Sequence, residues 1–170
     1  AYEVEQSGRR FLNPVLRVRR GATLHAEFWN QLDETSIIHW HGMRVDANND
    51  GNPHYAVAPG EIYSYRIPVR NRAGTCWYHP HPNALTAAQV YRGLASFLIV
   101  QDEEDDALAR ALGLELGETD LPLLLQDRRL DAERRFVREP DTADLFLGML
   151  GSTPMVNYLA DASLDATPRI

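Results

Sequence analysis

Short runs of alternating polarity, separated by turn-forming residues, fill the first hundred positions of this chain. Alternation with a period of two is typical of strands with one buried and one exposed face. Four runs stand out, at residues 15–19, 24–29, 62–67 and 95–100. The segments between them are rich in Asn, Asp, Gly and Pro, the residues that turns require. Short strands with frequent turns predict an all-β sandwich or barrel, and about 100 residues suffice for one such core.

The composition changes at residue 102. An acidic run over residues 102–106 leads into an Ala/Leu-rich segment that ends at Gly113. Acidic residues at the start and a glycine just past the end are typical of a short helix. We therefore expect a first domain over residues 1–101 and a linker containing this helix over residues 102–117. A solvated charge run is the alternative interpretation.

Residues 118–170 continue with apolar runs at 121–126, which is expected to form a strand, and at 145–150. About 50 residues are too few to bury a second core. Alone, they would expose apolar strands, at 121–125 and at 145–150, and unpaired strand edges. We expect this segment to be the N-terminal part of a second, incomplete domain whose remainder lies elsewhere.

Charge and hydropathy argue against two classes of partner. The 170 residues include 17 Lys+Arg and 24 Asp+Glu, a net charge of −7. Nucleic-acid binding normally needs a basic patch, so no nucleic-acid partner is expected. No run approaches 18 consecutive apolar residues, so no membrane span is expected. The chain starts at Ala1 without a leader, which indicates a removed signal peptide or a trimmed chain.

Four of the six histidines lie in two pairs, His39 with His41 and His79 with His81. Residues i and i+2 of a strand project from one face, about 6.6 Å apart. Two such strands side by side would gather four imidazoles, the ligands that copper, zinc, iron and nickel accept. A ring nitrogen must lie about 2 Å from its metal, so neighbouring histidines can serve adjacent metals as easily as one. One pair alone is more often ordinary surface or core histidine, but two pairs favour a metal site.

Alternation also sorts the residues around the second pair. Pro80 cannot donate a hydrogen bond to a ladder, so its strand is expected to be an edge strand or to end there. Cys76 falls on the face opposite His79 and His81, so we expect a buried structural thiol. It is the only cysteine, which excludes an intramolecular disulfide.

Three further residues could belong to a metal site: His25, His54 and Asp50. His25 and His54 have no partner pattern and are expected not to be ligands. Asp50 precedes Gly51 in an Asn/Asp-rich loop. By composition it is a turn residue. The functional alternative is a carboxylate held near the metals as a proton donor.

The histidine segments resemble a known family. Residues 35–42 (TSIIHWHG) and 74–81 (GTCWYHPH) resemble the two N-terminal copper motifs of multicopper oxidases. Residues 89–95 (QVYRGLA), followed by FLIV at 97–100, are similar to the family after its second motif. Residues 121–128 (LPLLLQDR) are similar to the start of domain 2 in bacterial three-domain, laccase-like members. The resemblance implies a cupredoxin-like Greek-key β-sandwich followed by an incomplete second cupredoxin-like domain.

The resemblance also implies a role for each candidate site residue. His39 would ligate the type 2 copper. His41 and His79 would serve one copper of the type 3 pair, and His81 the other. Asp50 is at the position of the carboxylate that relays protons during oxygen reduction in this family.

The implied function is that of a laccase-like multicopper oxidase, an enzyme that couples one-electron oxidation of a substrate to four-electron reduction of dioxygen to water. The reducing substrate would be a phenol or a metal ion, and the location extracytoplasmic. The type 1 copper ligands and the other half of the trinuclear ligands are not in this chain, and Cys76 lacks a His-Cys-His context. We therefore expect a complementary C-terminal polypeptide that carries the remaining ligands, without which the chain is inactive.

Two alternatives remain open at this stage. The chain could be a non-catalytic copper-binding fragment that lacks the type 1 site. It could also be a mononuclear metal hydrolase with three or four histidine ligands, although no distinct general base stands out in the sequence.

Overall fold

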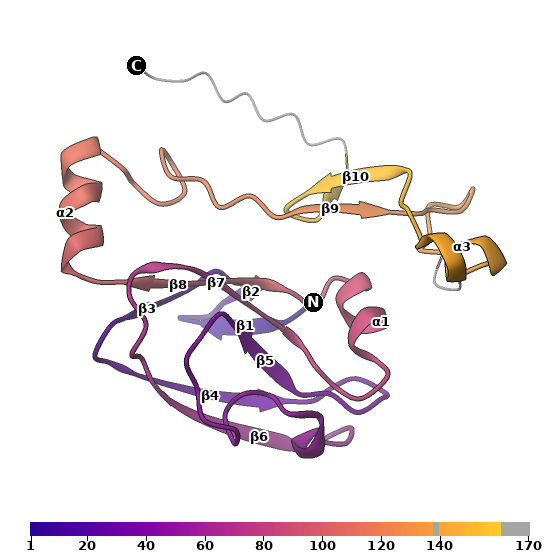
Figure 1. Cartoon of the computed structure of the whole chain (residues 1–170), viewed down its shortest axis with the longest axis horizontal. Helices are drawn as coiled ribbons and strands as arrows, with labels where there is room; N and C mark the ends of the chain where they lie inside the picture. Colours follow the sequence, from indigo (N-terminus) through magenta and orange to yellow (C-terminus); the bar gives the residue numbers. More distant parts are fainter. Residues whose placement is uncertain (138–139, 161–170) are drawn as a thin grey trace. The chain divides into compact units, whose positions relative to one another are not determined.

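A computed structural model describes residues 1–137 and 140–160, and the chain divides into two compact units, residues 1–121 and 122–170. The first unit is a sandwich of two β-layers (Figure 1). One layer is a four-stranded sheet in the order β3 (Leu16–Arg19), β8 (Ser96–Gln101), β7 (Gly74–Pro80) and β5 (Ile38–His41). The other layer pairs β4 (Thr23–Trp29) with β6 (Ile62–Pro68). All four strands expected from the alternating runs are confirmed.

Antiparallel pairing of β5 with β7 decides which side chains share a face. The register sets Trp40 opposite Tyr78 and His39 opposite His79. Trp40 and Tyr78 face the second layer, where the Trp40 ring meets the ring of Tyr65 edge-on at 5.2 Å. The intervening histidines therefore occupy the opposite, outer face of the four-stranded sheet.

The inner faces of the two layers form the hydrophobic core. Its buried members come mainly from β5, β6 and β8, and include Ile37, Ile38, Trp40, Tyr65, Ile67, Val69, Tyr78, Leu98 and Val100. One polar contact joins the layers through this core. The Tyr65 hydroxyl accepts a hydrogen bond from the Ile38 N–H at 2.8 Å and donates to the Ile38 carbonyl at 3.1 Å. The hydroxyl thereby satisfies both main-chain groups of a residue in β5, which is the last strand of its sheet.

Pro80 is the last residue of β7, which confirms one of the two expectations for it. The edge-strand alternative is wrong, because β7 lies between β8 and β5. Pairing with β8 stops at Tyr78 opposite Ser96, so no β8 partner needs an N–H from Pro80. Beyond it, the His81 N–H donates to the Ile37 carbonyl at 2.9 Å and keeps the chain beside β5.

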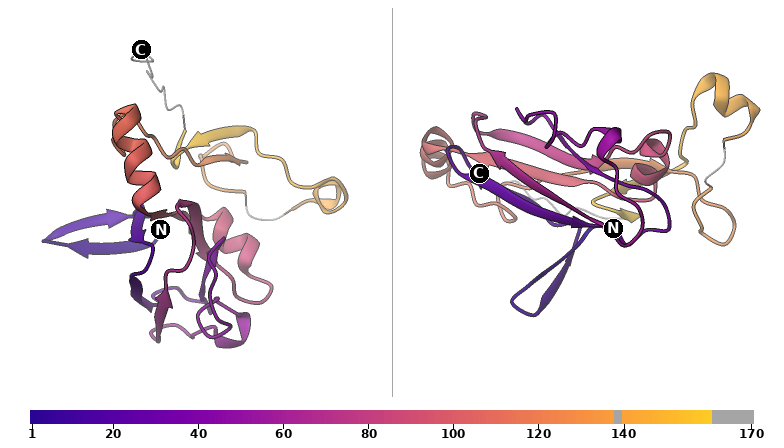
Figure 2. Two further views of the ribbon diagram at one scale, coloured as in Figure 1. Left: turned by 60° about the vertical axis from the view of Figure 1, so that its left-hand side comes forward. Right: turned by 90° about the horizontal axis from the view of Figure 1, so that it is seen from below.

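The remaining elements of the first unit lie outside the sandwich. A hairpin of β1 (Glu3–Gln6) and β2 (Arg9–Leu12) projects from the unit (Figure 2). No sequence pattern predicted it. A short helix α1 (Thr86–Tyr91) follows β7, and a 3-10 turn η1 spans Pro53–Tyr55.

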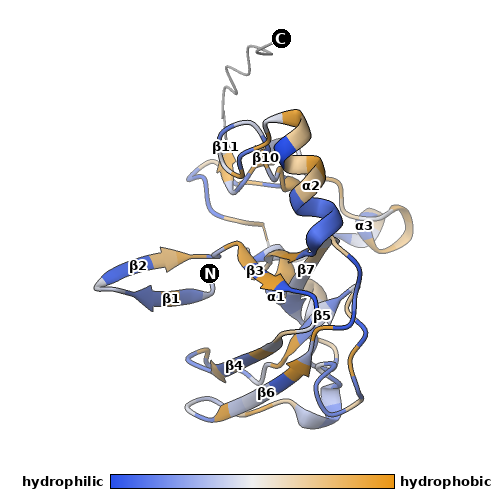
Figure 3. Ribbon diagram, turned by 90° about the vertical axis from the view of Figure 1, so that its left-hand side faces the viewer, coloured by the Kyte–Doolittle hydropathy of each residue, from blue (hydrophilic) through white to orange (hydrophobic). Residues whose placement is uncertain are grey.

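Helix α2 (Glu103–Leu112) follows β8 directly. Its N-cap, Asp102, accepts hydrogen bonds from the main-chain N–H groups of Glu104 and Asp105, and Gly113 ends it in a left-handed conformation. Figure 3 shows its acidic first turn as hydrophilic and its second half as mostly hydrophobic, with Arg110 as the charged exception. The acidic run therefore forms the N-cap and first turn of this helix, so the two interpretations of the segment are compatible.

The second unit carries a three-stranded antiparallel sheet in the order β11 (Leu159–Ala160), β10 (Thr153–Val156) and β9 (Leu125–Arg128), together with α3 (Thr142–Leu147). Two expectations need correction. The strand expected at 121–126 begins only at Leu125. The apolar run at 145–150 begins in a helix, because Asp141 and Asp144 form a capping box that starts α3.

The protein is therefore mainly β in class, and its first unit is a two-layer β-sandwich. Residues 138–139 and 161–170, part of the expected second domain, lie outside the described residues. The expected limits of domain 1, linker and domain 2 stay predictions. No helix among the described residues is both long enough and apolar enough to cross a membrane.

Candidate metal centre

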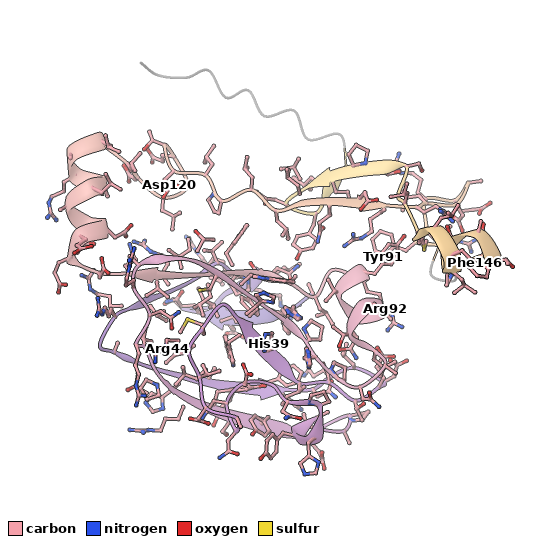
Figure 4. All side chains as sticks on the ribbon, in the orientation of Figure 1. His39, Arg44, Tyr91, Arg92, Asp120 and Phe146 are labelled. Carbon is pink, nitrogen blue, oxygen red and sulfur yellow. The ribbon has the colours of Figure 1, made fainter. Side chains whose placement is uncertain are left out.

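The histidines of β5 and β7 meet on the outer face of the four-stranded sheet. The ring of His39, labelled in Figure 4, lies 5.4 Å from that of His41 and 5.2 Å from that of His79, between centroids. His81, just past the end of β7, has its ring 5.3 Å from His39. Alternation along each strand and the register between them produce this cluster, as the sequence predicts.

The Nδ1 nitrogen of His39 is engaged by the loop that follows β5. Nδ1 lies 2.7 Å from the main-chain carbonyl oxygen of Asp50. A carbonyl can only accept, so Nδ1 must carry the proton. The neutral ring then has its lone pair on Nε2, which is the nitrogen left to bind a metal.

His79 is fixed in the same way. Its Nδ1 donates to the carbonyl oxygen of Pro80 at 2.8 Å, which leaves Nε2 with the lone pair. Burial lowers the pKa of His79 to about 4, helped by the neighbouring histidines and opposed by the hydrogen bond to Pro80. His79 is therefore neutral at physiological pH, the state that metal binding requires.

The nitrogens of His41 and His79 approach each other most closely. His41 Nδ1 lies 3.4 Å from His79 Nε2. Two ligand atoms that are each about 2 Å from one ion lie no more than about 4 Å apart. One ion can therefore sit between these two nitrogens without rearrangement of the strands.

Three of the four histidines are placed so that they could hold one metal ion together. One ring nitrogen from each of His39, His41 and His79 lies within 4.8 Å of the others. His81 lies outside this group, but its buried Nδ1 has no hydrogen-bond partner among the described residues. A buried polar atom without a partner is costly. All donors here are imidazoles, which suit copper, zinc, iron and nickel.

Asp50 is held against His39 by its main chain and its side chain together. Its Oδ1 lies 3.2 Å from His39 Nδ1, and the side chain is 47% exposed. The carboxylate thus reaches both solvent and the histidine cluster. The turn and functional interpretations of Asp50 are compatible, because Asp50 and Gly51 form part of the turn that leads to η1.

The other candidates lie away from the cluster. Cys76 is on the inner face, as expected, but it is half-buried and not fully buried. Burial raises the pKa of its thiol, which disfavours the thiolate that binds metals. His25 on β4 and His54 on η1 are both exposed and are not in the histidine group found among the described residues.

Sequence reasoning missed the groups that support the cluster. The Trp77 ring lies between two histidine rings, 4.9 Å from His41 and 4.2 Å from His79. The signal was present, since Trp77 shares the face of His79 and its register partner is His41.

A buried polar network ties α1 to the segment before β5. Gln89 is fully buried, and its amide accepts from the Ser36 hydroxyl at 2.8 Å and donates to the Thr35 carbonyl at 2.9 Å. Glu34 accepts from Gln89 at 3.1 Å and from Arg92, labelled in Figure 4, at 2.7 Å. No sequence signal pointed to this network, since its members are separated by more than 50 positions.

Known proteins are similar to this chain over most of its length. The family model described as multicopper oxidase matches residues 3–105. A Staphylococcus aureus protein, multicopper oxidase mco, is 33% identical over 153 residues, which cover 90% of this chain and 33% of that protein.

Two solved structures show the same similarity. McoA multicopper oxidase from the hyperthermophile Aquifex aeolicus is 43% identical, with a TM-score of 0.84 over 92% of this chain and 33% of its own. The laccase-like multicopper oxidase CueO from Ochrobactrum sp. is 36% identical, with a TM-score of 0.79 over 88% of this chain and 33% of its own.

These matches show that the chain belongs to the multicopper oxidase family, whose members are oxidoreductases that bind copper. It spans about a third of the length of the relatives that it matches.

Proposed function

We propose that this chain supplies half of the protein ligands of a trinuclear copper site in a laccase-like multicopper oxidase. In that enzyme, dioxygen is reduced to water with four electrons that a substrate provides one at a time. The observation that carries the proposal is the convergence of ring nitrogens from His39, His41 and His79 within 4.8 Å of one another.

The proposed roles are those that the family resemblance implies, and the positions of the nitrogens are compatible with them. His39 binds the type 2 copper through Nε2, because Nδ1 is engaged by the Asp50 carbonyl. His41 Nδ1 and His79 Nε2, 3.4 Å apart, serve one copper of the type 3 pair. His81 serves the other. Its buried Nδ1 has no hydrogen-bond partner among residues 1–137 and 140–160, which supports a role as a ligand.

Copper, when bound, supplies the one-electron redox chemistry that amino-acid side chains lack. The residues of this chain hold its ligands in place and manage protons. Asp50 is the proposed proton donor, because its Oδ1 is 3.2 Å from His39 Nδ1 and its half-exposed side chain can take a proton from solvent. Cys76 is not a type 1 ligand, since it lies on the inner face with a raised pKa.

The remaining parts of the enzyme are proposed to come from a complementary C-terminal polypeptide with the type 1 copper and the other trinuclear ligands. The reducing substrate is a phenol or a metal ion. The Ochrobactrum relative is described with oxidase activity towards lignin model compounds and lignosulfonate, which supports the former. An extracytoplasmic location is proposed from the resemblance to exported family members.

A non-catalytic copper-binding fragment is the second candidate. It is favoured by a specific observation: the histidine nitrogens converge within one strand pair of this chain, so they can bind copper without any other polypeptide. The two candidates differ in copper count and in partner.

Native mass spectrometry of the purified protein, followed by the denatured sample, separates them. The oxidase is supported by this chain together with a larger polypeptide and about four coppers, with oxygen consumption on a phenolic donor as the next step. This chain alone, or copies of it with two coppers or fewer each, supports the binding fragment. Absence of copper after reconstitution with Cu(I) and Cu(II) contradicts both.

A further inference from the structure

The loop that carries Asp50 contacts β5 through a residue without a side chain. Gly51 is buried and has a φ of +72°. A Cβ built on it would overlap the carbonyl oxygen of Ile38 and would lie 2.6 Å from the main-chain nitrogen of His39. Ordinary contacts between such atoms are about 3.5 Å. An alanine at this position would therefore force the loop and β5 apart.

The strand cannot give way easily. Both main-chain groups of Ile38 are hydrogen-bonded to the Tyr65 hydroxyl, and Ile38 pairs in register with Pro80. The loop is held to β6 through Asn49, whose Oδ1 accepts from the Arg66 N–H at 2.7 Å, but Asp50 and Gly51 are not paired in a strand. We therefore expect this end of the loop to move, by roughly 1 Å to restore an ordinary contact.

The residue before Gly51 holds the His39 ring. The Asp50 carbonyl accepts from His39 Nδ1 at 2.7 Å, and a retreat of about 1 Å would take this pair beyond hydrogen-bonding distance. We propose that Gly51 is a positioning residue for His39: its bare backbone lets the Asp50 carbonyl hold the ring with Nδ1 protonated and Nε2 directed at the histidine cluster. The importance of this for copper rests on the proposed function, whereas the tautomer itself does not.

The test is the protonation of the His39 ring in the metal-free chain near neutral pH. Long-range proton–nitrogen NMR of ¹⁵N-histidine-labelled protein distinguishes protonated from unprotonated ring nitrogens, and the His39 signals are assigned by their loss in His39→Gln. The unmodified chain is expected to show Nδ1–H only. Gly51→Ala is expected to show a mixture with Nε2–H.

Two variants serve as matched controls. Gly60 has a φ of +84° with nothing within 4 Å of a built Cβ, so Gly60→Ala imposes the same backbone strain without the overlap. Asp50→Ala removes the carboxylate and keeps the carbonyl. Both are expected to retain Nδ1–H at His39.

A folded Gly51→Ala chain that keeps Nδ1–H overturns the proposal, as does Nε2–H in the unmodified chain. If Gly51→Ala does not fold, one glycine inserted between Asp50 and Gly51 moves the carbonyl without adding a Cβ. Loss of Nδ1–H in that variant supports the proposal, and its retention overturns it.

Copper binding gives an independent readout. Loss of an outer hydrogen bond to a metal-binding histidine typically weakens binding about 10- to 100-fold, so Gly51→Ala should bind Cu(II) that much more weakly than Gly60→Ala. Equal affinities would overturn the positioning role. If the unmodified chain binds no copper, the proposed function fails while the result on the tautomer stands.

Discussion

The two faces of the β5–β7 pair are built from alternate residues of the same strands, yet they have opposite chemistry. Trp40 and Tyr78 are buried in the hydrophobic core, whereas His39 and His79 lie on the other face and gather ring nitrogens, although His79 is buried as well. The inner face is held in place mainly by hydrophobic packing. The outer face has only the Trp77 ring beside its histidines, so their positions depend largely on the packing behind them.

The second unit offers a contrast to both faces. Its apolar residues are largely exposed within the described structure, including Phe146, labelled in Figure 4, at 84%. Alternation separates a core from a site only where a second layer covers one face.

The largest effect is expected from the inner face. Trp40→Ala removes a fully buried ring in contact with Tyr65 and should lower the free energy of unfolding by about 3–5 kcal/mol. Urea denaturation measures this. Trp40→Phe is the control, because the Trp40 Nε1 has no hydrogen-bond partner to lose within the part of the chain that the structure describes. A cost near zero for Trp40→Ala would contradict the assignment of this face to the core.

A smaller effect is expected where the two layers are joined by a polar contact. Tyr65→Phe leaves the buried N–H and carbonyl of Ile38 without their partner and should cost about 1–3 kcal/mol in unfolding free energy. Since Ile38 precedes His39, the same variant should also weaken copper binding, measured by competition with a chelator. Unchanged copper affinity at reduced stability would show that the two faces are independent.

The outer face should show the reverse pattern. His41 is exposed, so His41→Ala should change the unfolding free energy by no more than about 0.5 kcal/mol. Copper affinity should fall at least about tenfold, because one of the two nitrogens 3.4 Å apart is lost. His25→Ala, on an exposed strand position outside the cluster, is the matched control. Equal loss of affinity in both variants would exclude His41 as a ligand.

The smallest effect is expected at Asp102, which lies on neither face of the β5–β7 pair. This effect depends on pH. Hydrogen bonds from the Ala73 and Asp105 main chain lower the pKa of Asp102 from 3.8. Its stabilising contribution is therefore complete above about pH 3.8 and is lost as the pH falls through the lowered value. As the pH falls across this range, the melting temperature of the unmodified chain should decrease more steeply than that of Asp102→Asn. Identical profiles would remove Asp102 as a source of acid sensitivity.

Prediction from the sequence was most successful where apolar and polar residues alternate with a period of two. The strands at 24–29 and 62–67 were predicted from alternation and confirmed as β4 and β6. Residues 145–147 were misjudged, because an apolar run does not distinguish strand from helix and the capping box of Asp141 and Asp144 decided it. The hairpin of β1 and β2 was missed because its alternation is weak and its residues are exposed.

The sequence by itself determined which residues could form a site: four histidines at i and i+2, each pair on one face of its strand because a strand has a period of two. Only the folded structure decided which ring nitrogen is available at His39 and at His79. For His39 the choice depends on the carbonyl group of Asp50 in the following loop, and for His79 it depends on the carbonyl group of the adjacent Pro80. At His39 it also depends on Gly51, whose importance comes from a contact with β5 that only the folded loop makes. Spacing along a chain fixes the direction of a side chain, whereas the hydrogen bonds of the folded chain fix its orientation and protonation.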